Sequence, residues 1–145
     1  MLSFDTNLVV YAANSSAPEQ ERAAEFLHSL GSRQDVVVCE LMLVEVYLKL
    51  RNPRILPRPM GAAAAAAFCA ALRNNPSWQV VEFAPVITEV WKLATAKDFA
   101  FRRIIDARLA FTLRHHGVTE FATSNTKDFA GFGFLRVWNP LSANG

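Results

Sequence analysis

The sequence predicts an α/β fold in which a central, mainly parallel sheet carries helices on both faces. Short apolar runs alternate along the chain with longer segments that carry helix start and stop signals. Such alternation is typical of βαβ units, whose connecting helices cover both faces of a parallel sheet. With 145 residues, 52% of them apolar and 19% charged, we expect one compact domain over residues 1–145.

The first half of the chain should supply two strands that lead directly into helices. Pro18 and acidic residues open one helix, and Gly31 ends it. Residues 40–50 are apolar on nearly every face, so this helix is expected to cross the interior. Three prolines and three arginines in residues 51–59 predict an exposed basic loop. The predicted strands are residues 2–4 and 35–38, and the predicted helices are residues 8–13, 18–30, 40–50 and 62–72.

The second half repeats the alternation. Residues 78–83 have the pattern of a strand, and an amphipathic helix is expected over residues 86–99. A further helix is expected over residues 106–116, because Gly117 provides its stop. Late strands are expected at residues 120–123 and 134–137.

Composition limits the environment and the partners. A net charge of +2 tolerates a polyanionic partner, but it is weaker than the charge of proteins that coat nucleic acids. Cys39 and Cys69 lie in apolar surroundings and are expected to act as small hydrophobic residues in a reducing cytoplasm. No secretory signal is apparent, and Glu45 and Lys49 interrupt the most hydrophobic segment, so we expect a soluble cytoplasmic protein without a membrane span.

Side-chain oxygen ligands recur among apolar neighbours in four short segments. An ionised group in such a setting costs several kcal/mol unless a cation or hydrogen bonds satisfy it. No Cys or His cluster accompanies these oxygens, so a hard cation, Mg²⁺ or Mn²⁺, fits them better than zinc. The candidates are Asp5, Glu45, Asp106, Asn125 and Asp128.

Each candidate also has a purely structural interpretation. Asp5 is equally consistent with a helix N-cap or an Asx turn. Glu45 is suited to an i,i+4 ion pair with Lys49. Its apolar helical neighbours disfavour full exposure and so favour a functional role.

The later candidates are weaker when each is taken alone. Asp106 can cap the following helix or pair with Arg102 one turn earlier. Asn125 and Asp128 can be ordinary turn residues. The functional interpretation therefore depends on all of the candidates together.

Other chemistries find less support. His115 and His116 are adjacent on a predicted helix, hence about 100° apart, and near a helix C-terminus they suit the helix dipole better than a metal. There is no glycine-rich phosphate loop, and no serine has a base at a spacing that predicts a triad. Asp5 lacks the second aspartate of a D-x-D motif, which disfavours a metal-dependent phosphatase.

In order and spacing, the chain resembles the PIN-domain ribonucleases, specifically the VapC-like toxins of bacterial toxin–antitoxin pairs. The resemblance spans nearly the whole chain and is carried by F-D-T-N, L-V-E-V-Y-L-K-L-R-N-P, I-I-D-A-R-L-A, T-S-N-T-K-D-F and the closing V-W-N-P. It implies a PIN-like three-layer α/β/α sandwich and a Mg²⁺- or Mn²⁺-dependent endoribonuclease that hydrolyses RNA phosphodiester bonds. It also implies a cognate antitoxin that occupies or distorts the site.

The resemblance also assigns roles to residues. Asp5, Glu45 and Asp106 match the family's three acidic positions, with Asp5 and Asp106 as the direct metal ligands. Many relatives have an acidic residue where Asn125 stands, whereas here only Asp128 is acidic in that segment. Asn125 can instead ligate weakly, bind a water or hold Asp5 in place.

Contacts with partners are less specified by the sequence. The alanine-rich segment 62–72 suits a close contact in a homodimer or with an antitoxin, although helix propensity explains the alanines equally well. Two alternatives share these residues: a PIN nuclease of housekeeping RNA processing, and a decayed site that only binds RNA or a partner. Basic residues that can contact the RNA backbone are Arg51, Arg54, Arg58, Arg102, Arg103 and Lys127.

Overall fold

The computed structural model describes residues 1–142, so the last three residues of the predicted domain lie outside it. Its strands are β1 (Leu2–Phe4), β2 (Val37–Cys39), β3 (Gln79–Val81), β4 (Glu120–Ala122) and β5 (Arg136–Trp138). β1, β4 and β5 form one parallel ladder, and β2 and β3 form another. A parallel bridge between Leu2 and Val36 joins the two ladders. The strands therefore follow one another in the spatial order β3, β2, β1, β4, β5, and the predicted parallel sheet is confirmed.

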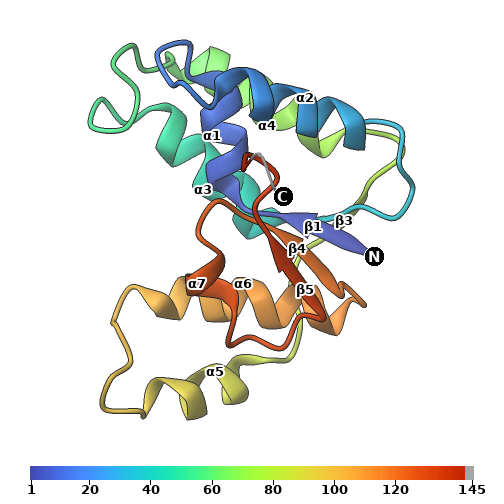
Figure 1. The fold of residues 1–145 in the computed structure, drawn as a ribbon, viewed down its shortest axis with the longest axis vertical. Coiled ribbons are helices and arrows are strands. Elements are labelled where there is room, and N and C mark those ends of the chain that lie inside the picture. Colours follow the sequence, from blue (N-terminus) through green and yellow to red (C-terminus); the bar gives the residue numbers. More distant parts are fainter. Residues whose placement is uncertain (143–145) are drawn as a thin grey trace.

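Helices cover the sheet on two sides. Figure 1 shows α1, α2, α3 and α4 on one side of the strands and α5, α6 and α7 on the other. The predicted three-layer α/β/α sandwich is thereby confirmed. The bounds are α1 (Thr6–Ala13), α2 (Gln20–Leu30), α3 (Glu40–Leu50), α4 (Ala62–Arg73), α5 (Ile87–Ala94), α6 (Arg103–His115) and α7 (Thr126–Phe129). Among the helices of residues 1–142, none combines the length and hydropathy of a membrane-spanning helix.

The core is apolar and rich in aromatic side chains. Every residue of β1 and β2 is buried, as expected for parallel strands that are covered on both faces. Phe121 of β4 stacks on Phe134 with 5.0 Å between ring centroids, and Trp78 meets Phe4 edge-on at 5.5 Å. These contacts pack β1 and β4 against the segments that lead into β3 and β5.

The prediction that residues 40–50 cross the interior is wrong. The bounds of α3 are as predicted, but Val44 is 54% exposed and Leu48 is 61% exposed. Met42, Val46 and Leu50 lie four residues apart and face the core, so one face of the helix is buried while the other is solvated.

Element boundaries also differ from the predictions. The helix predicted over 86–99 ends at Ala94, because the Thr95 hydroxyl donates to the Lys92 carbonyl at 2.7 Å and competes with the helical bonds. α6 begins at Arg103, three residues before the predicted start, so Asp106 lies inside its first turn. The late strand lies at 136–138 rather than 134–137, and the short helix α7 was not predicted.

Candidate active site

The sheet order places the ends of β1 and β4 side by side. From β1 the chain crosses to β2 on one side, whereas β4 lies on the other side, so the connections diverge between β1 and β4. In open parallel sheets, such a switch point leaves a crevice at the carboxyl ends of the strands, where ligands bind. Asp5 directly follows β1, and its N–H bonds the Ala122 carbonyl at the end of β4 at 2.8 Å.

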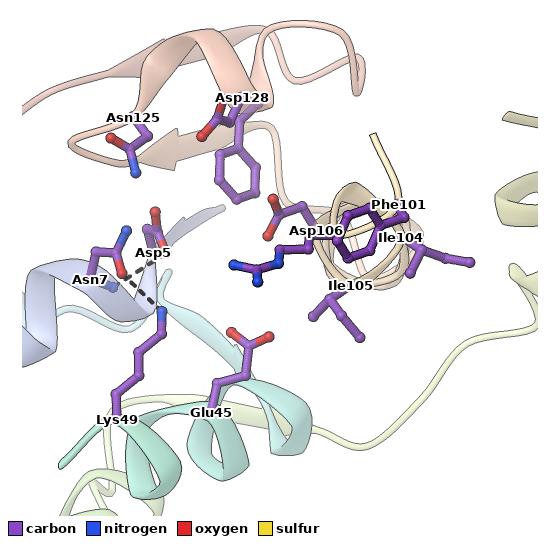
Figure 2. Close-up of a pocket in the computed structure, with 12 residues that line it drawn as sticks. Asp5, Asn7, Glu45, Lys49, Phe101, Ile104, Ile105, Asp106, Asn125 and Asp128 are labelled. Carbon is purple, nitrogen blue, oxygen red and sulfur yellow. Dashed lines mark hydrogen bonds between the residues drawn. The ribbon is translucent and has the colours of Figure 1, made fainter. Parts of the chain in front are cut away.

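A cavity of about 560 Å³ opens at this point. Figure 2 shows carboxylates and amides from several elements facing it: the β1–α1 turn, α3, α6 and the segment at α7. The structure thus brings together all five candidate residues that were predicted from the sequence. The residues that line the cavity are Asp5, Asn7, Glu45, Lys49, Phe101, Arg102, Ile104, Ile105, Asp106, Asn125, Asp128 and Phe129.

Asp5 is nearly fully buried and firmly held. One carboxylate oxygen, Oδ1, accepts from the Asn7 backbone N–H at 3.3 Å, which makes Asp5 the N-cap of α1. The other oxygen, Oδ2, accepts from the Thr123 hydroxyl at 2.7 Å. The N-cap interpretation is therefore confirmed, and it coexists with a position on the cavity wall.

Thr123 performs the orienting role that was one of the suggestions for Asn125. Its buried hydroxyl donates to Asp5 and accepts from the Asn125 backbone N–H at 2.9 Å. Among the described residues, no hydrogen bond joins the Asn125 side chain to Asp5. Thr123 thus ties the end of β4 to the carboxylate that follows β1.

Glu45 projects from α3 into the cavity without the Lys49 ion pair that was its structural alternative. The Lys49 ammonium donates to Thr6 Oγ1 at 2.7 Å and to Asn7 Oδ1 at 2.8 Å, and within residues 1–142 it makes no ion pair with Glu45. Burial and the charge of Asp5 raise the pKa of Glu45, while the positive charge of Lys49 opposes the rise. The lysine therefore acts on Glu45 through its charge and not through a direct contact.

Asp106 is the most perturbed carboxylate of the cavity. Burial raises its pKa to about 6, with further contributions from the negative charges of Asp5, Glu45 and Asp128. In the described chain, no ion pair joins it to Arg102, and Arg102 rather than Asp106 occupies the N-cap position of α6. Neither structural alternative for Asp106 is realised.

Asn125 and Asp128 form the outer wall of the cavity. Asn125 precedes α7, which is a single helical turn that contains Asp128, and the Asp128 N–H bonds the Asn125 carbonyl at 3.0 Å. Both side chains are solvent-exposed and line the cavity opposite α3. Over residues 1–142, no three acidic, His or Cys side chains converge tightly enough to form a compact metal-ligand cluster. The carboxylates thus surround a shared space and do not touch.

The donor set of this cavity matches a hard divalent cation. Its possible ligands are carboxylate and amide oxygens, without sulfur or imidazole. Burial first, and then the repulsion from neighbouring carboxylates, raise the pKa of Glu45 and of Asp106, and a bound cation would oppose both effects. The residues present therefore fit Mg²⁺ or Mn²⁺, and their roles as ligands remain a prediction.

A comparison with protein families matches residues 3–135 to the PIN domain. The chain belongs to the PIN-domain family. Over 145 residues, it is 52% identical to Ribonuclease VapC24 from two strains of Mycobacterium tuberculosis, with all of both chains covered. The family predicted from the five sequence motifs is confirmed.

Solved structures agree with this PIN-type fold. The VapC20 structure from Mycobacterium tuberculosis, described as a Sarcin-Ricin loop cleaving toxin, superposes with a TM-score of 0.63 at 18% identity, covering 83% of this chain and 87% of that one. The FitAcB structure from Neisseria gonorrhoeae gives 0.64 at 20% identity, covering 97% and 98%. At these identities the likeness concerns the fold.

The sequence did not predict several residues that line the PIN-type cavity or support Asp5 from behind it. Thr123 and Thr6 resemble ordinary strand and turn residues, and only their position beside Asp5 in space distinguishes them. At the candidate site, Lys49 was expected only as an ion-pair partner of Glu45, whereas its ammonium bonds Thr6 and Asn7. Phe101 gave no signal in the sequence, because an isolated aromatic residue is usually part of a core.

Proposed function

We propose that this protein is a metal-dependent endoribonuclease of the VapC type that serves as the toxin of a toxin–antitoxin pair. Membership of the PIN family and full-length similarity to a VapC ribonuclease support the enzyme class. The observation that supports the site is the convergence of Asp5, Glu45, Asp106, Asn125 and Asp128 on one cavity at the switch point of the sheet.

Asp5 and Asp106 are the proposed ligands of Mg²⁺ or Mn²⁺. The first is held by Thr123 and by the start of α1, so its orientation is fixed before an ion arrives. Within residues 1–142, Asp106 lacks such hydrogen bonds, and its pKa is raised to about 6, so below about pH 6 a metal ion must displace its proton. When bound, the ion supplies a more acidic water and positive charge against the phosphate.

The remaining residues are assigned supporting roles. Glu45 faces the same space with a raised pKa and is placed to accept a hydrogen bond from a water. Asn125 and Asp128 bound the cavity on the solvent side, where they meet the substrate or its hydration shell. Lys49 limits the repulsion among the carboxylates and offers positive charge to a phosphate oxygen.

For the partners, we propose a cognate antitoxin and a homodimer. The alanine-rich helix α4 buries only Ala65 fully and leaves most of its small side chains in solvent. Beside it, the exposed Val44 of α3 lines a groove that α4 completes. Small side chains allow another backbone to approach closely, which supports this face as the site of association.

Cleavage of a mixed pool of structured RNA by the purified, antitoxin-free protein tests the proposal. Cleavage should need Mg²⁺ or Mn²⁺, stop with chelator and vanish in Asp5→Asn. The matched control is Asp35→Asn, because Asp35 pairs with Arg33 on the surface and does not line the cavity. A folded protein that cleaves with chelator present, or whose Asp5→Asn variant cleaves normally, would contradict the proposal.

A further inference from the structure

One aromatic side chain at the rim of the cavity is strongly exposed. Phe101 lies in the loop before α6 and is 79% exposed, yet it lines the same cavity as the carboxylates. Figure 2 shows Phe101 and Ile105 on the α6 side of the cavity, which also carries Asp106. Ile105 is itself 44% exposed, so the rim next to Asp106 is apolar.

The neighbour of this ring is a cation that lines the same cavity. The guanidinium carbon of Arg102 lies 5.6 Å from the centroid of the Phe101 ring. Arg102 also lines a second, smaller hollow with Arg103, Asp106 and Asp128. An aromatic face and a positive charge are therefore adjacent at the entrance to the site.

Electrostatic attraction alone would bind RNA poorly at this cavity. Four carboxylates line it, from Asp5, Glu45, Asp106 and Asp128, against the two cations Lys49 and Arg102. This excess of negative charge repels an RNA phosphate backbone until a metal ion is bound. Binding that does not depend on charge would help to keep RNA at the entrance, and stacking on an aromatic ring is of this kind.

We propose that Phe101 is a stacking platform for a nucleobase of single-stranded RNA next to the cleaved phosphodiester, with Arg102 contacting the adjoining phosphate. This inference rests on the proposed ribonuclease function and adds a base-binding subsite to it. Sequence-specific recognition of RNA targets unpaired bases, which stack on aromatic rings and guanidinium planes. An unpaired base can reach the exposed face of Phe101, whereas a base inside a helix cannot.

The competing occupant is an apolar side chain of a protein partner. A nucleobase is favoured because the ring stands at the mouth of the carboxylate-lined cavity and has a cation beside it. Other exposed apolar side chains, such as Phe83 at 66% and Trp91 at 57%, do not line this cavity. Phe83 therefore offers a matched control for the loss of an exposed phenyl ring.

The test is binding of a short single-stranded RNA that carries 2-aminopurine, with Ca²⁺ in place of Mg²⁺, to the full-length protein. Phe101→Ala should weaken binding by about 5- to 150-fold, the range that corresponds to ~1–3 kcal/mol per stacked base. Phe101→Trp should retain both the affinity and the fluorescence quenching that stacking produces. Phe101→Leu should lose both, and Phe83→Ala should behave as the wild type.

Several results would overturn the inference. Unchanged RNA binding by Phe101→Ala, or wild-type RNA affinity in Phe101→Leu, would exclude stacking. A Phe101→Ala protein that binds RNA normally but no longer binds the antitoxin would assign the ring to the protein partner instead. Thermal unfolding of each variant confirms that it is folded. If the wild type cleaves RNA while Phe101→Ala binds normally, only this subsite fails. If the wild type neither binds nor cleaves RNA, the proposed function fails with it.

Discussion

Replacing Asp106 with asparagine is expected to stabilise the metal-free protein at neutral pH. In the folded protein, burial and neighbouring carboxylates raise the Asp106 pKa from an ordinary 3.8 to about 6. That rise corresponds to ~3 kcal/mol of unfolding free energy lost once the group is ionised. Because the side chain is only half-buried, solvent screening reduces the expected effect to ~1–2 kcal/mol.

The direction in which stability changes with pH follows from proton binding to Asp106. Between about pH 4 and 6 the folded state holds more protons on Asp106 than the unfolded state, so stability falls as the pH rises through this window. The neutral amide of Asp106→Asn carries no such penalty. The variant should therefore match the wild type near pH 4 and exceed it by ~1–2 kcal/mol at pH 7.5.

Urea denaturation at several pH values in chelator measures this difference. Adding Mg²⁺ should reverse the order, because the wild type gains ~2.7 kcal/mol at 100 times its Kd while the variant gains less. Asp98→Asn, an exposed aspartate that does not line the cavity, serves as the control. Equal stability at pH 7.5 in chelator, or a difference that does not change with pH, would refute the reasoning.

Three further predictions concern the surroundings of the site. Thr123→Val removes the buried hydroxyl that bonds Asp5 and should lower the free energy of unfolding by ~1.5–3 kcal/mol, measured by urea denaturation at pH 7. Thr123→Ser should retain most of the wild-type stability, and equal destabilisation by both substitutions would argue against the hydrogen bond. Lys49→Met should tighten Mg²⁺ binding about two- to five-fold by calorimetry, the equivalent of a partly screened ~0.5–1 kcal/mol charge interaction; weaker binding would contradict this. Ala66→Arg on exposed α4 should abolish association without unfolding the chain, and unchanged elution from a sizing column would rule that face out.

Most of the fold could be predicted from local patterns. Apolar β1 and β2 and the capped segments that follow them produce the alternation of a parallel sheet, and α3 was located at its actual bounds. Burial was harder to predict, because the exposure of Val44 and Leu48 depends on what packs against α3. The end of α5 was missed because the bond from Thr95 to the Lys92 carbonyl outweighs the amphipathic pattern.

The candidate site could be predicted only as a set of residues. Asp5, Glu45 and Asp106 are far apart in sequence, and their meeting depends on the strand order, which places β1 beside β4. The supporting contacts were not predictable. Thr123 reaches Asp5 across neighbouring strands, and the ammonium of Lys49 turns to Thr6 and Asn7 instead of Glu45.

The most direct test of the central claim, that this cavity holds a divalent ion, is a crystal structure with Mn²⁺ located by its anomalous scattering. A peak at direct-coordination distance from the carboxylates of both Asp5 and Asp106, absent from crystals of Asp5→Asn, is the expected result. A fully occupied peak elsewhere on the protein, or none in this cavity at saturating Mn²⁺, would contradict the metal site and the mechanism proposed from it.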